Sequence, residues 1–348
     1  MSRNKLILNS FKYILTVLLL FAYLLWSLLW SENYKVDAKL DYPIELDIKD
    51  QTSLDELINL LKENGKLESV WSFKLMSSIK SFDYNIKSGT VQLYDSYNNN
   101  DLINVLRLPS KRVLDLQIPE NIRLIEDMIV ILEDSIGFNR GDLTTYLDTS
   151  SFLSNNGFNM QTLSALFIPN TYQLYKGLSV ESFLNKMKRE YNSFWNEKRV
   201  SKCDSLGLTK IEVSILASIV EEEQDKRLDE RPMIAGLYLN RLNNPSSFPY
   251  LQADPTVKFA NKNFGIKQVL YKHTDVESPY NTYKVKGLPP GPICIPSINA
   301  IDAVLYASQH DYYFMCAGSN GDGYHKFTSS NKEHNRNKNK YKKYQNFK

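Results

Sequence analysis

The longest run of hydrophobic positions lies at the N-terminal end of the chain. Residues 13–30 are apolar apart from Thr16 and Ser27, close to the ~20 residues that a helix needs to cross a bilayer. Basic residues precede the run and the first charge after it is acidic, so we expect a cytoplasmic N-terminus with the rest of the chain outside. Trp30 and several leucines fill the end where a signal peptidase needs small residues, which favours an uncleaved anchor over a cleaved signal peptide.

Shorter patterns follow and predict a small α+β module. Ser53 and Glu56 form a capping box before apolar residues at helical spacing, and Gly65 is expected to end this helix in a left-handed conformation. A second short helix is expected over residues 101–106. Strands are predicted over residues 44–48, 90–94 and 113–118.

Helical patterns dominate the rest of the chain. Helices are expected over residues 122–136, where Gly137 stops the pattern, and over residues 181–198. Thr209 and Glu212 make a second capping box, and apolar residues then cover nearly the whole circumference of the helix up to residue 220. Such a helix is buried rather than lying on the surface.

Three consecutive glutamates, Glu221, Glu222 and Glu223, follow this buried helix directly. At least one of the three should border the interior, where desolvation and neighbouring like charges raise the pKa of a carboxyl group. A carboxylic acid that still carries its proton near neutral pH can act as a general acid. Composition alone leaves open the alternative that the glutamates are a polar helix end.

Further along, three polar segments have the residue types of a sugar-binding site. Residues 251–257 read Leu-Gln-Ala-Asp-Pro-Thr-Val, residues 279–283 read Pro-Tyr-Asn-Thr-Tyr, and residues 287–293 form a proline-rich, non-helical loop. Short polar side chains bind sugar hydroxyls, and tyrosine rings pack on sugar faces. Ordinary turns explain any one of these segments equally well.

Composition and charge exclude several other classes. The formal net charge is +3, from 42 basic and 39 acidic residues spread along 348 positions, which argues against a nucleic-acid binder. Three cysteines and four histidines show no metal-ligand spacing, so we expect no metal or other cofactor. The basic stretch over residues 332–348 is more typical of a solvated terminal helix than of a polyanion-binding tail.

Taken in order, these segments resemble the YceG-like family of endolytic murein transglycosylases. The resemblance also rests on Phe-Ile-Pro-Asn-Thr-Tyr (167–172), Leu-Ala-Ser-Ile-Val-Glu (216–221), Asn-Arg-Leu (240–242), Gly-Leu-Pro-Pro-Gly-Pro-Ile (287–293) and His-Lys-Phe (325–327). It runs from the anchor almost to the C-terminus. This chain departs from the family pattern at Glu222, where a lysine is usual, and at Asn170, where an aspartate is usual.

The resemblance implies an α+β protein with three parts. Residues 1–31 would be a cytoplasmic tip and transmembrane anchor, residues 32–120 a LysM-like glycan-binding region, and residues 121–348 the catalytic domain. Glu221 would be the catalytic residue. The implied supporting or substrate-binding residues are Glu223, Gln252, Asp254, Thr256, Tyr280, Asn281, Thr282, Tyr283, Asn170 and Tyr172.

The implied activity is lytic cleavage of peptidoglycan between MurNAc and GlcNAc, which leaves 1,6-anhydro-MurNAc ends and terminates nascent strands. The implied setting is the inner membrane, with the catalytic part in the periplasm, peptidoglycan strands as substrate, and peptidoglycan synthases as partners. Two alternatives stay open. A non-catalytic scaffold would only bind glycan, and a hydrolytic muramidase would need a second carboxylate, for which Asp254 is the candidate.

Overall fold

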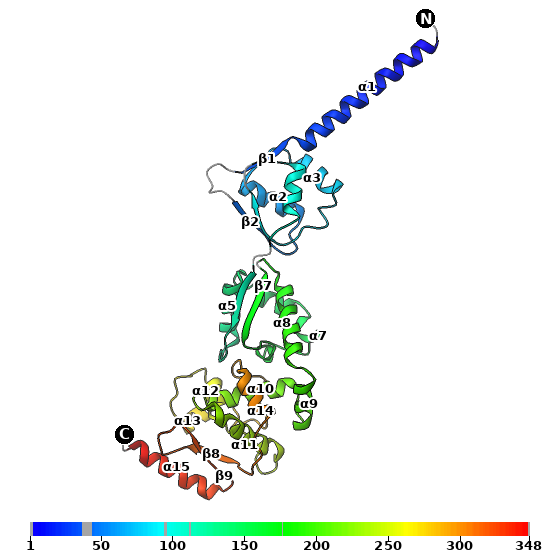
Figure 1. The fold of residues 1–348 in the computed structure, drawn as a ribbon. Helices are drawn as coiled ribbons and strands as arrows, with labels where there is room; N and C mark the ends of the chain where they lie inside the picture. Colours follow the sequence, from blue (N-terminus) through cyan, green and yellow to red (C-terminus); the bar gives the residue numbers. More distant parts are fainter. Residues whose placement is uncertain (1–2, 37–43, 94–95, 111–112, 176, 347–348) are drawn as a thin grey trace. The chain divides into compact units, whose positions relative to one another are not determined.

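The computed structural model describes residues 3–36, 44–93, 96–110, 113–175 and 177–346. Its elements are a mixture of helices and short strands, so the α+β class is confirmed (Figure 1). The chain forms two compact units. The first contains residues 1–115 and 173–182, and the second contains residues 116–172 and 183–348.

The N-terminal helix α1 (Arg3–Trp30) contains the predicted anchor. Among the described residues, no helix combines the length and the apolar character needed to cross a membrane. The side chains of Leu24, Leu25 and Leu28, which belong to the predicted apolar run, lie outside the described residues. The anchor therefore stays a prediction.

Besides α1, the described part of the first unit combines two small antiparallel sheets with three helices. Strand β1 (Glu32–Val36) lies between β3 (Gly65–Leu67) and β5 (Ser96–Asn98). Strand β2 (Ile44–Ile48), over the predicted residues, pairs with β4 (Gly89–Leu93), within one residue of its predicted bounds. The helices are α2 (Leu54–Glu63), α3 (Val70–Ile79) and α4 (Asn99–Leu106).

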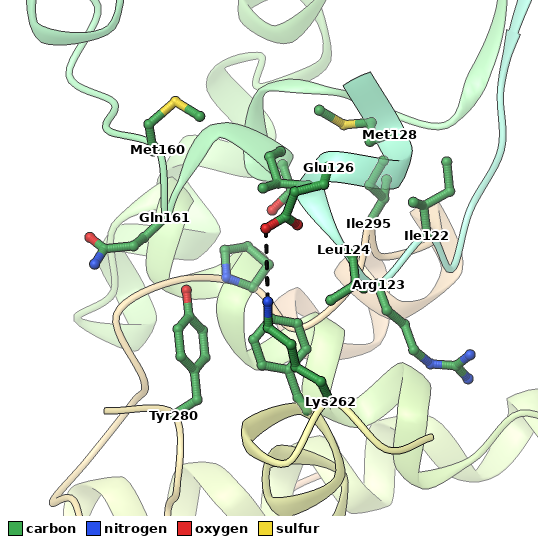
Figure 2. A pocket seen from close by; sticks show the side chains of 14 residues that line it. Ile122, Arg123, Leu124, Glu126, Met128, Met160, Gln161, Lys262, Tyr280 and Ile295 are labelled. Atoms are coloured by element: carbon green, nitrogen blue, oxygen red, sulfur yellow. Dashed lines mark ion pairs between the residues drawn. The ribbon is translucent and has the colours of Figure 1, made fainter. Parts of the chain in front are cut away.

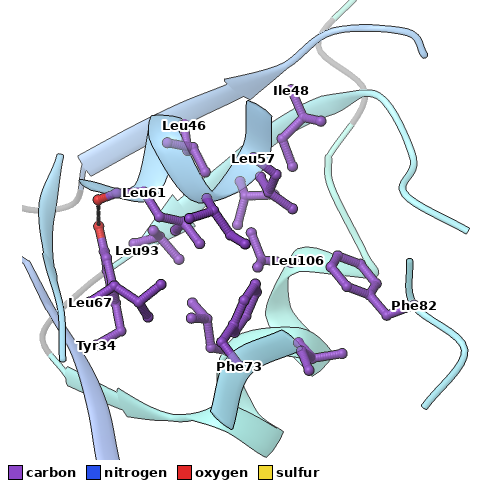
Figure 3. Close-up of a cluster of buried hydrophobic side chains, with 14 of the residues drawn as sticks. Tyr34, Leu46, Ile48, Leu57, Leu61, Leu67, Phe73, Phe82, Leu93 and Leu106 are labelled. Atoms are coloured by element: carbon purple, nitrogen blue, oxygen red, sulfur yellow. Dashed lines mark hydrogen bonds between the residues drawn. The ribbon is translucent and has the colours of Figure 1, made fainter. Parts of the chain in front are cut away.

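The core of the first unit is continuous across both sheets (Figure 3). Alternate residues of β2 point inward and pack with the buried faces of the three helices. The Tyr34 hydroxyl, inside this core, donates a hydrogen bond of 3.2 Å to the carbonyl oxygen of Leu61. The capping box of Ser53 and Glu56 is confirmed.

The predicted left-handed stop at Gly65 is wrong. Helix α2 ends at Glu63 with Asn64 as its C-cap, and Gly65 begins β3, where it pairs with Val36. A side chain at Gly65 would collide with the carbonyl oxygen of Lys35. The glycine is therefore needed for close strand approach and not for a left-handed turn.

The division between the units runs through β6 (Val113–Ile118), β7 (Asn170–Tyr175) and α8 (Val180–Phe194). Strands β6 and β7 pair with each other. The second unit then adds one strand pair, β8 (Phe314–Ala317) and β9 (His325–Thr328). Its further helices are α5 (Ile125–Ile136), α6 (Asp142–Thr149), α7 (Phe152–Asn155), η1 (Leu163–Leu166), α9 (Glu197–Leu206), α10 (Lys210–Glu223), η2 (Leu228–Glu230), α11 (Arg231–Asn243), α12 (Asp254–Ala260), α13 (Tyr271–Thr274), α14 (Ile298–Leu305) and α15 (Asn331–Asn346).

Two predicted helices differ from the observed ones. The first begins at Ile125 instead of residue 122, because Leu124 is extended, and it ends before left-handed Gly137 as predicted. The second, expected over residues 181–198, is broken into α8 and α9. Asn196 causes the break, since it is extended and its side chain caps α9 through the backbone N–H of Arg199.

Helix α10 is the centre of the second unit. The predicted capping box of Thr209 and Glu212 starts it, and every residue from Val213 to Glu221 is buried. Helices α11, α12 and α14 pack around it. The end of α10, with its three glutamates, is therefore fixed by the core.

Candidate active site

A cavity of about 630 Å³ opens in the second unit at the end of α10. It lies among α11, the start of α12, the strand pair β8–β9 and the C-terminal helix α15. Its lining includes Glu223, Tyr238, Arg241, Gln252, Asp254, Lys267, Gln268, Tyr283, His325, His334, Lys338 and Lys342. Of the three consecutive glutamates, only Glu223 lines it.

Glu223 is half-buried and directed into this cavity. Its Oε1 atom accepts a hydrogen bond of 2.5 Å from the hydroxyl of Tyr238 on α11. Burial raises the pKa of Glu223 to about 7, and the negative charge of Asp254 adds to the rise, although Tyr238, His325 and Arg241 oppose it. The cavity therefore contains a carboxyl group that keeps a substantial share of its proton at neutral pH.

Glu221 has a different environment. It is 6% exposed, and its Oε1 accepts a hydrogen bond of 2.8 Å from Nη2 of Arg231. Its Oε2 accepts from the backbone N–H of Ser297 at 3.1 Å and from the Ser297 hydroxyl at 2.5 Å. Arg231 also donates to Ser297, to Asn299 and to the carbonyl oxygen of Gln224. This network joins the ends of α10, α11 and α14 in the core, and Glu221 does not line the cavity.

Glu222 faces a third direction. Its carboxylate pairs with Arg123, with Nε at 2.7 Å and Nη2 at 3.1 Å. The Arg123 guanidinium also lies 5.0 Å from the centre of the Phe264 ring. Consecutive residues on a helix point to different sides, so the three glutamates have three separate partners.

Asp254 and Tyr283 also line the cavity. The Tyr283 hydroxyl donates to Oδ1 of Asp254 at 2.7 Å. Gln252, two residues before Asp254, is exposed in the cavity lining and has a left-handed backbone with φ 52°. A non-glycine residue in this region is strained by about 1–3 kcal/mol, and such strain is common at binding sites.

Thr256 and Thr282 are fully buried and position the residues beside them. Their hydroxyl oxygens lie 2.7 Å apart, and Thr282 Oγ1 accepts a hydrogen bond from the backbone N–H of Ala253 at 3.0 Å. These bonds join the segment that carries Asp254 to the segment that carries Tyr283. The two threonines, predicted as site residues, support the cavity without lining it.

The remaining predicted residues lie elsewhere. Buried Asn281 donates to the carbonyl oxygens of Thr274 and Val276, so it shapes the loop. Asn170 and Tyr172 belong to β7, and neither lines this cavity. The Tyr172 hydroxyl donates to the carbonyl oxygen of Ile168 at 2.7 Å.

Tyr280 lines a second, smaller pocket of about 250 Å³ (Figure 2). The wall of this pocket also includes Gln161 and the ion pair of Lys262 with Glu126, whose charged atoms are 3.9 Å apart. Tyr280 and Tyr283 are three positions apart in the sequence, but they line different pockets.

The cavity also contains residues that the sequence did not single out as site residues. His325 lies in a predicted family motif, and its Nδ1 is 2.7 Å from Oε2 of buried Glu230. Burial lowers the pKa of His325, but the hydrogen bond and charge of Glu230 outweigh burial and the net shift is upward. Arg241, from the Asn-Arg-Leu motif, donates to the carbonyl oxygens of Leu251 and Tyr313. No sequence signal pointed to Tyr238.

Within the described residues, no group of three or more His, Cys, Asp or Glu side chains is arranged to hold a metal ion. The three cysteines are free thiols, with Cys203 and Cys294 buried. The chemical groups that the cavity offers include carboxyl groups, phenols, two imidazoles and basic side chains.

Comparison with known proteins agrees with the motifs that surround this cavity. The sequence profile of the YceG-like family matches residues 46–340, which is most of the chain. The chain belongs to the YceG-like family. The match includes all three glutamates and every cavity residue named above except Lys342.

Two bacterial proteins that are similar to this chain are both named endolytic murein transglycosylase. The Bacillus subtilis (strain 168) protein is 27% identical over 315 residues, covering 86% of this chain and 84% of that protein. The Streptococcus pneumoniae serotype 2 protein is 25% identical over 371 aligned positions, covering 97% of this chain. This chain spans only 65% of the length of the streptococcal protein.

A solved structure shares the fold. The crystal structure of a YceG-like protein from Listeria monocytogenes superposes with a TM-score of 0.52 at 23% identity. The superposition covers 84% of this chain and 98% of that chain. The YceG-like fold is therefore shared across most of the protein.

Proposed function

We propose that the protein is an endolytic peptidoglycan lytic transglycosylase in which Glu223 is the general acid and base. One observation carries this assignment. Glu223 is the one member of the glutamate triplet that lines the large cavity, and burial raises its pKa to about 7. The names of the relatives supply the reaction class, and the cavity supplies the acid that the reaction needs.

The proposed reaction moves one proton away from Glu223 and returns another. Protonated Glu223 donates to the glycosidic oxygen as the bond from this oxygen to C1 of MurNAc breaks. The resulting carboxylate then takes the proton of the C6 hydroxyl of the same MurNAc as this oxygen bonds to C1. The product has a 1,6-anhydro end and no water is consumed. Because the nucleophile is already held by the substrate, one carboxyl group is sufficient.

The neighbours of Glu223 support this role. Tyr238 holds one carboxyl oxygen in place, and the pKa of its hydroxyl is raised well above the usual value by burial and by the charge of Glu223. The hydroxyl therefore remains a donor across the whole working pH range. The charge of Asp254 helps to keep Glu223 protonated before the reaction.

Glu221, which the sequence favours, is better explained as a structural residue. Both its oxygens already accept hydrogen bonds from Arg231 and Ser297 inside the core. An acid there would have to break this network to reach a glycosidic oxygen. We therefore assign the catalytic role to Glu223 instead of Glu221.

A hydrolytic muramidase is the second candidate, because Asp254 lies in the same cavity and interacts electrostatically with Glu223. In that mechanism the second carboxylate would activate a water molecule. The Tyr283 hydroxyl occupies Oδ1 of Asp254, which favours the view that Asp254 tunes Glu223 rather than activating water.

Matched glutamine variants test whether the general acid is Glu223 or Glu221. Glu223→Gln should keep the fold and lower turnover of purified glycan strands by about 10²–10⁴-fold, the usual contribution of a general acid or base. Glu221→Gln should lower the free energy of unfolding by about 3–5 kcal/mol, because it leaves Arg231 as an uncompensated buried charge. Its folded fraction should still cleave. Normal turnover by Glu223→Gln, together with an inactive but folded Glu221→Gln, would restore the assignment to Glu221.

We further propose that the first unit binds the glycan strand as a LysM-like module, and that α1 anchors the protein with both units outside the cytoplasm. The apolar run and its flanking charges support the anchor. A function in ending nascent strands would bring the protein close to peptidoglycan synthases. These proposals place the catalytic cavity where its substrate is made.

A further inference from the structure

Three lysines line the active-site cavity, two of them on the C-terminal helix α15. Lys338 and Lys342 lie four residues apart on α15 and therefore on one face of it, and Lys267 comes from the loop after α12. We call these three residues the lysine wall. The other lysines near them on α15, including Lys332 and Lys340, do not line the cavity.

Strand pair β8–β9 supports the helix that carries this wall. The ring of His334 stacks on Phe314 of β8 with centroids 5.4 Å apart, and Thr328 of β9 donates to Glu333 at 2.9 Å. Burial, followed by the charges of Lys338 and Arg241, lowers the pKa of His334. Lys338, one turn further along α15, lines the cavity together with His334. Helix α15, which carries most of the basic C-terminal stretch, lines the cavity with one face and is exposed to solvent on the other.

In the parts of the chain that the structure describes, none of the three lysines forms an ion pair with a carboxylate. Besides two histidines, the cavity lining holds four lysine or arginine side chains, Arg241 and the lysine wall, against two carboxyl groups, Glu223 and Asp254. Because burial raises the pKa of Glu223 to about 7, protonation of this carboxyl group adds to the excess of positive charge in the cavity when the acid is ready to react.

We infer that the lysine wall binds the carboxylates of the stem peptide on the muramyl residue at the cleavage site. This inference rests on the proposed function. The sugar rings and hydroxyls of the strand are uncharged, so a positive cavity wall has no partner on them. The peptide attached to the lactyl group of MurNAc carries carboxylates, which lysine ammonium groups attract. The preferred substrate is therefore a peptide-bearing strand, not a bare glycan.

A binding experiment with the full-length protein tests the inference without needing turnover. Short glycan strands with intact stem peptides, and the same strands stripped by an amidase, are titrated against Glu223→Gln by fluorescence anisotropy. Stripping leaves one lactyl carboxylate and separates its contribution from that of the peptide. Peptide-bearing strands should bind on the order of tenfold more tightly, and the preference should shrink between ~50 and ~300 mM salt.

Two double variants in the same background give the comparison. Lys338→Gln with Lys342→Gln should remove most of the preference. Lys332→Gln with Lys340→Gln makes the same charge change on the same helix outside the cavity, and should retain it. Equal affinity for both strands, or an unchanged preference in the first double variant, would overturn the inference.

The outcome for the proposed function is read separately, from cleavage of both strands by the protein with native Glu223. Cleavage without a lysine-dependent preference for peptide-bearing strands would support the proposed function and reject the lysine wall as a binding site. A lysine-dependent preference without cleavage supports the wall as a binding site and rejects the proposed function.

Discussion

Individual side chains at the end of α10 show how adjacent residues of one type take different functions. Glu221 is enclosed by Arg231 and Ser297, Glu222 pairs with Arg123, and Glu223 opens to the cavity. The sequence correctly indicates that one carboxyl group there has a raised pKa. It cannot indicate which one, because that depends on how α10 is rotated against partners that lie between 10 and 99 residues away in the sequence.

The pH dependence of stability provides a test at the scale of this one residue. The pKa of Glu223 is raised from 4.5 to about 7 in the folded protein, so the folded state holds this proton more tightly than the unfolded state. Stability conferred by Glu223 is present below about pH 4.5 and is lost as the pH rises through 7.

Glu223→Gln removes this titration. The variant should therefore gain stability relative to the unmodified protein between pH 4.5 and pH 7, by about 3 kcal/mol at most. Urea unfolding at pH 4 and at pH 8 measures the difference. The gain should be absent at the lower pH, and a gain of equal size at both values would show that Glu223 has an ordinary pKa.

Helices and strands that depend on residues close together in the sequence were predictable. The capping boxes at Ser53 and Thr209 start helices as predicted, because their hydrogen bonds lie within four residues. Strand β2 follows from its own alternation. The sequence was misleading where a distant contact decides, as at Gly65, whose role depends on β1. The part of α15 in the cavity wall depends in the same way on β8 and β9.

The pairing of Thr256 with Thr282 gives a test at the scale of elements. Thr282→Val keeps the side-chain shape but removes the acceptor for the Ala253 N–H and the partner of the Thr256 hydroxyl. We expect a loss of about 1–3 kcal/mol in the free energy of unfolding, since both groups remain buried.

The same variant should also lower activity, because Asp254 and Tyr283 lose their fixed separation. Chemical denaturation and turnover on the same preparation provide the check. Thr274→Val is the control and should change neither quantity much, because Thr274 belongs to the short helix α13, which has no fully buried residue, and its hydroxyl donates only to the nearby carbonyl oxygen of Tyr271. Unchanged stability in Thr282→Val would show that the threonine pair does not join the two segments.

The whole molecule consists of two compact units, with the proposed anchor at α1 and the candidate active-site cavity in the second unit. The proposed topology places both units outside the cytoplasm. Fusions of a reporter that is active only outside the cytoplasm, made after Lys348, should therefore be active. Activity only in fusions with a cytoplasmic reporter would contradict the topology and would separate the cavity from peptidoglycan.

The proposed mechanism is tested most directly by the fate of water during cleavage. Full-length protein is incubated with uncrosslinked, peptide-bearing strands in water enriched in heavy oxygen, and the new MurNAc ends are analysed by mass spectrometry. If Glu223 acts alone with the C6 hydroxyl as nucleophile, the ends are 1,6-anhydro-MurNAc without label, and the early products are fragments of intermediate length. Heavy oxygen at reducing MurNAc ends would instead identify a hydrolase that uses a second carboxylate, and would contradict the account.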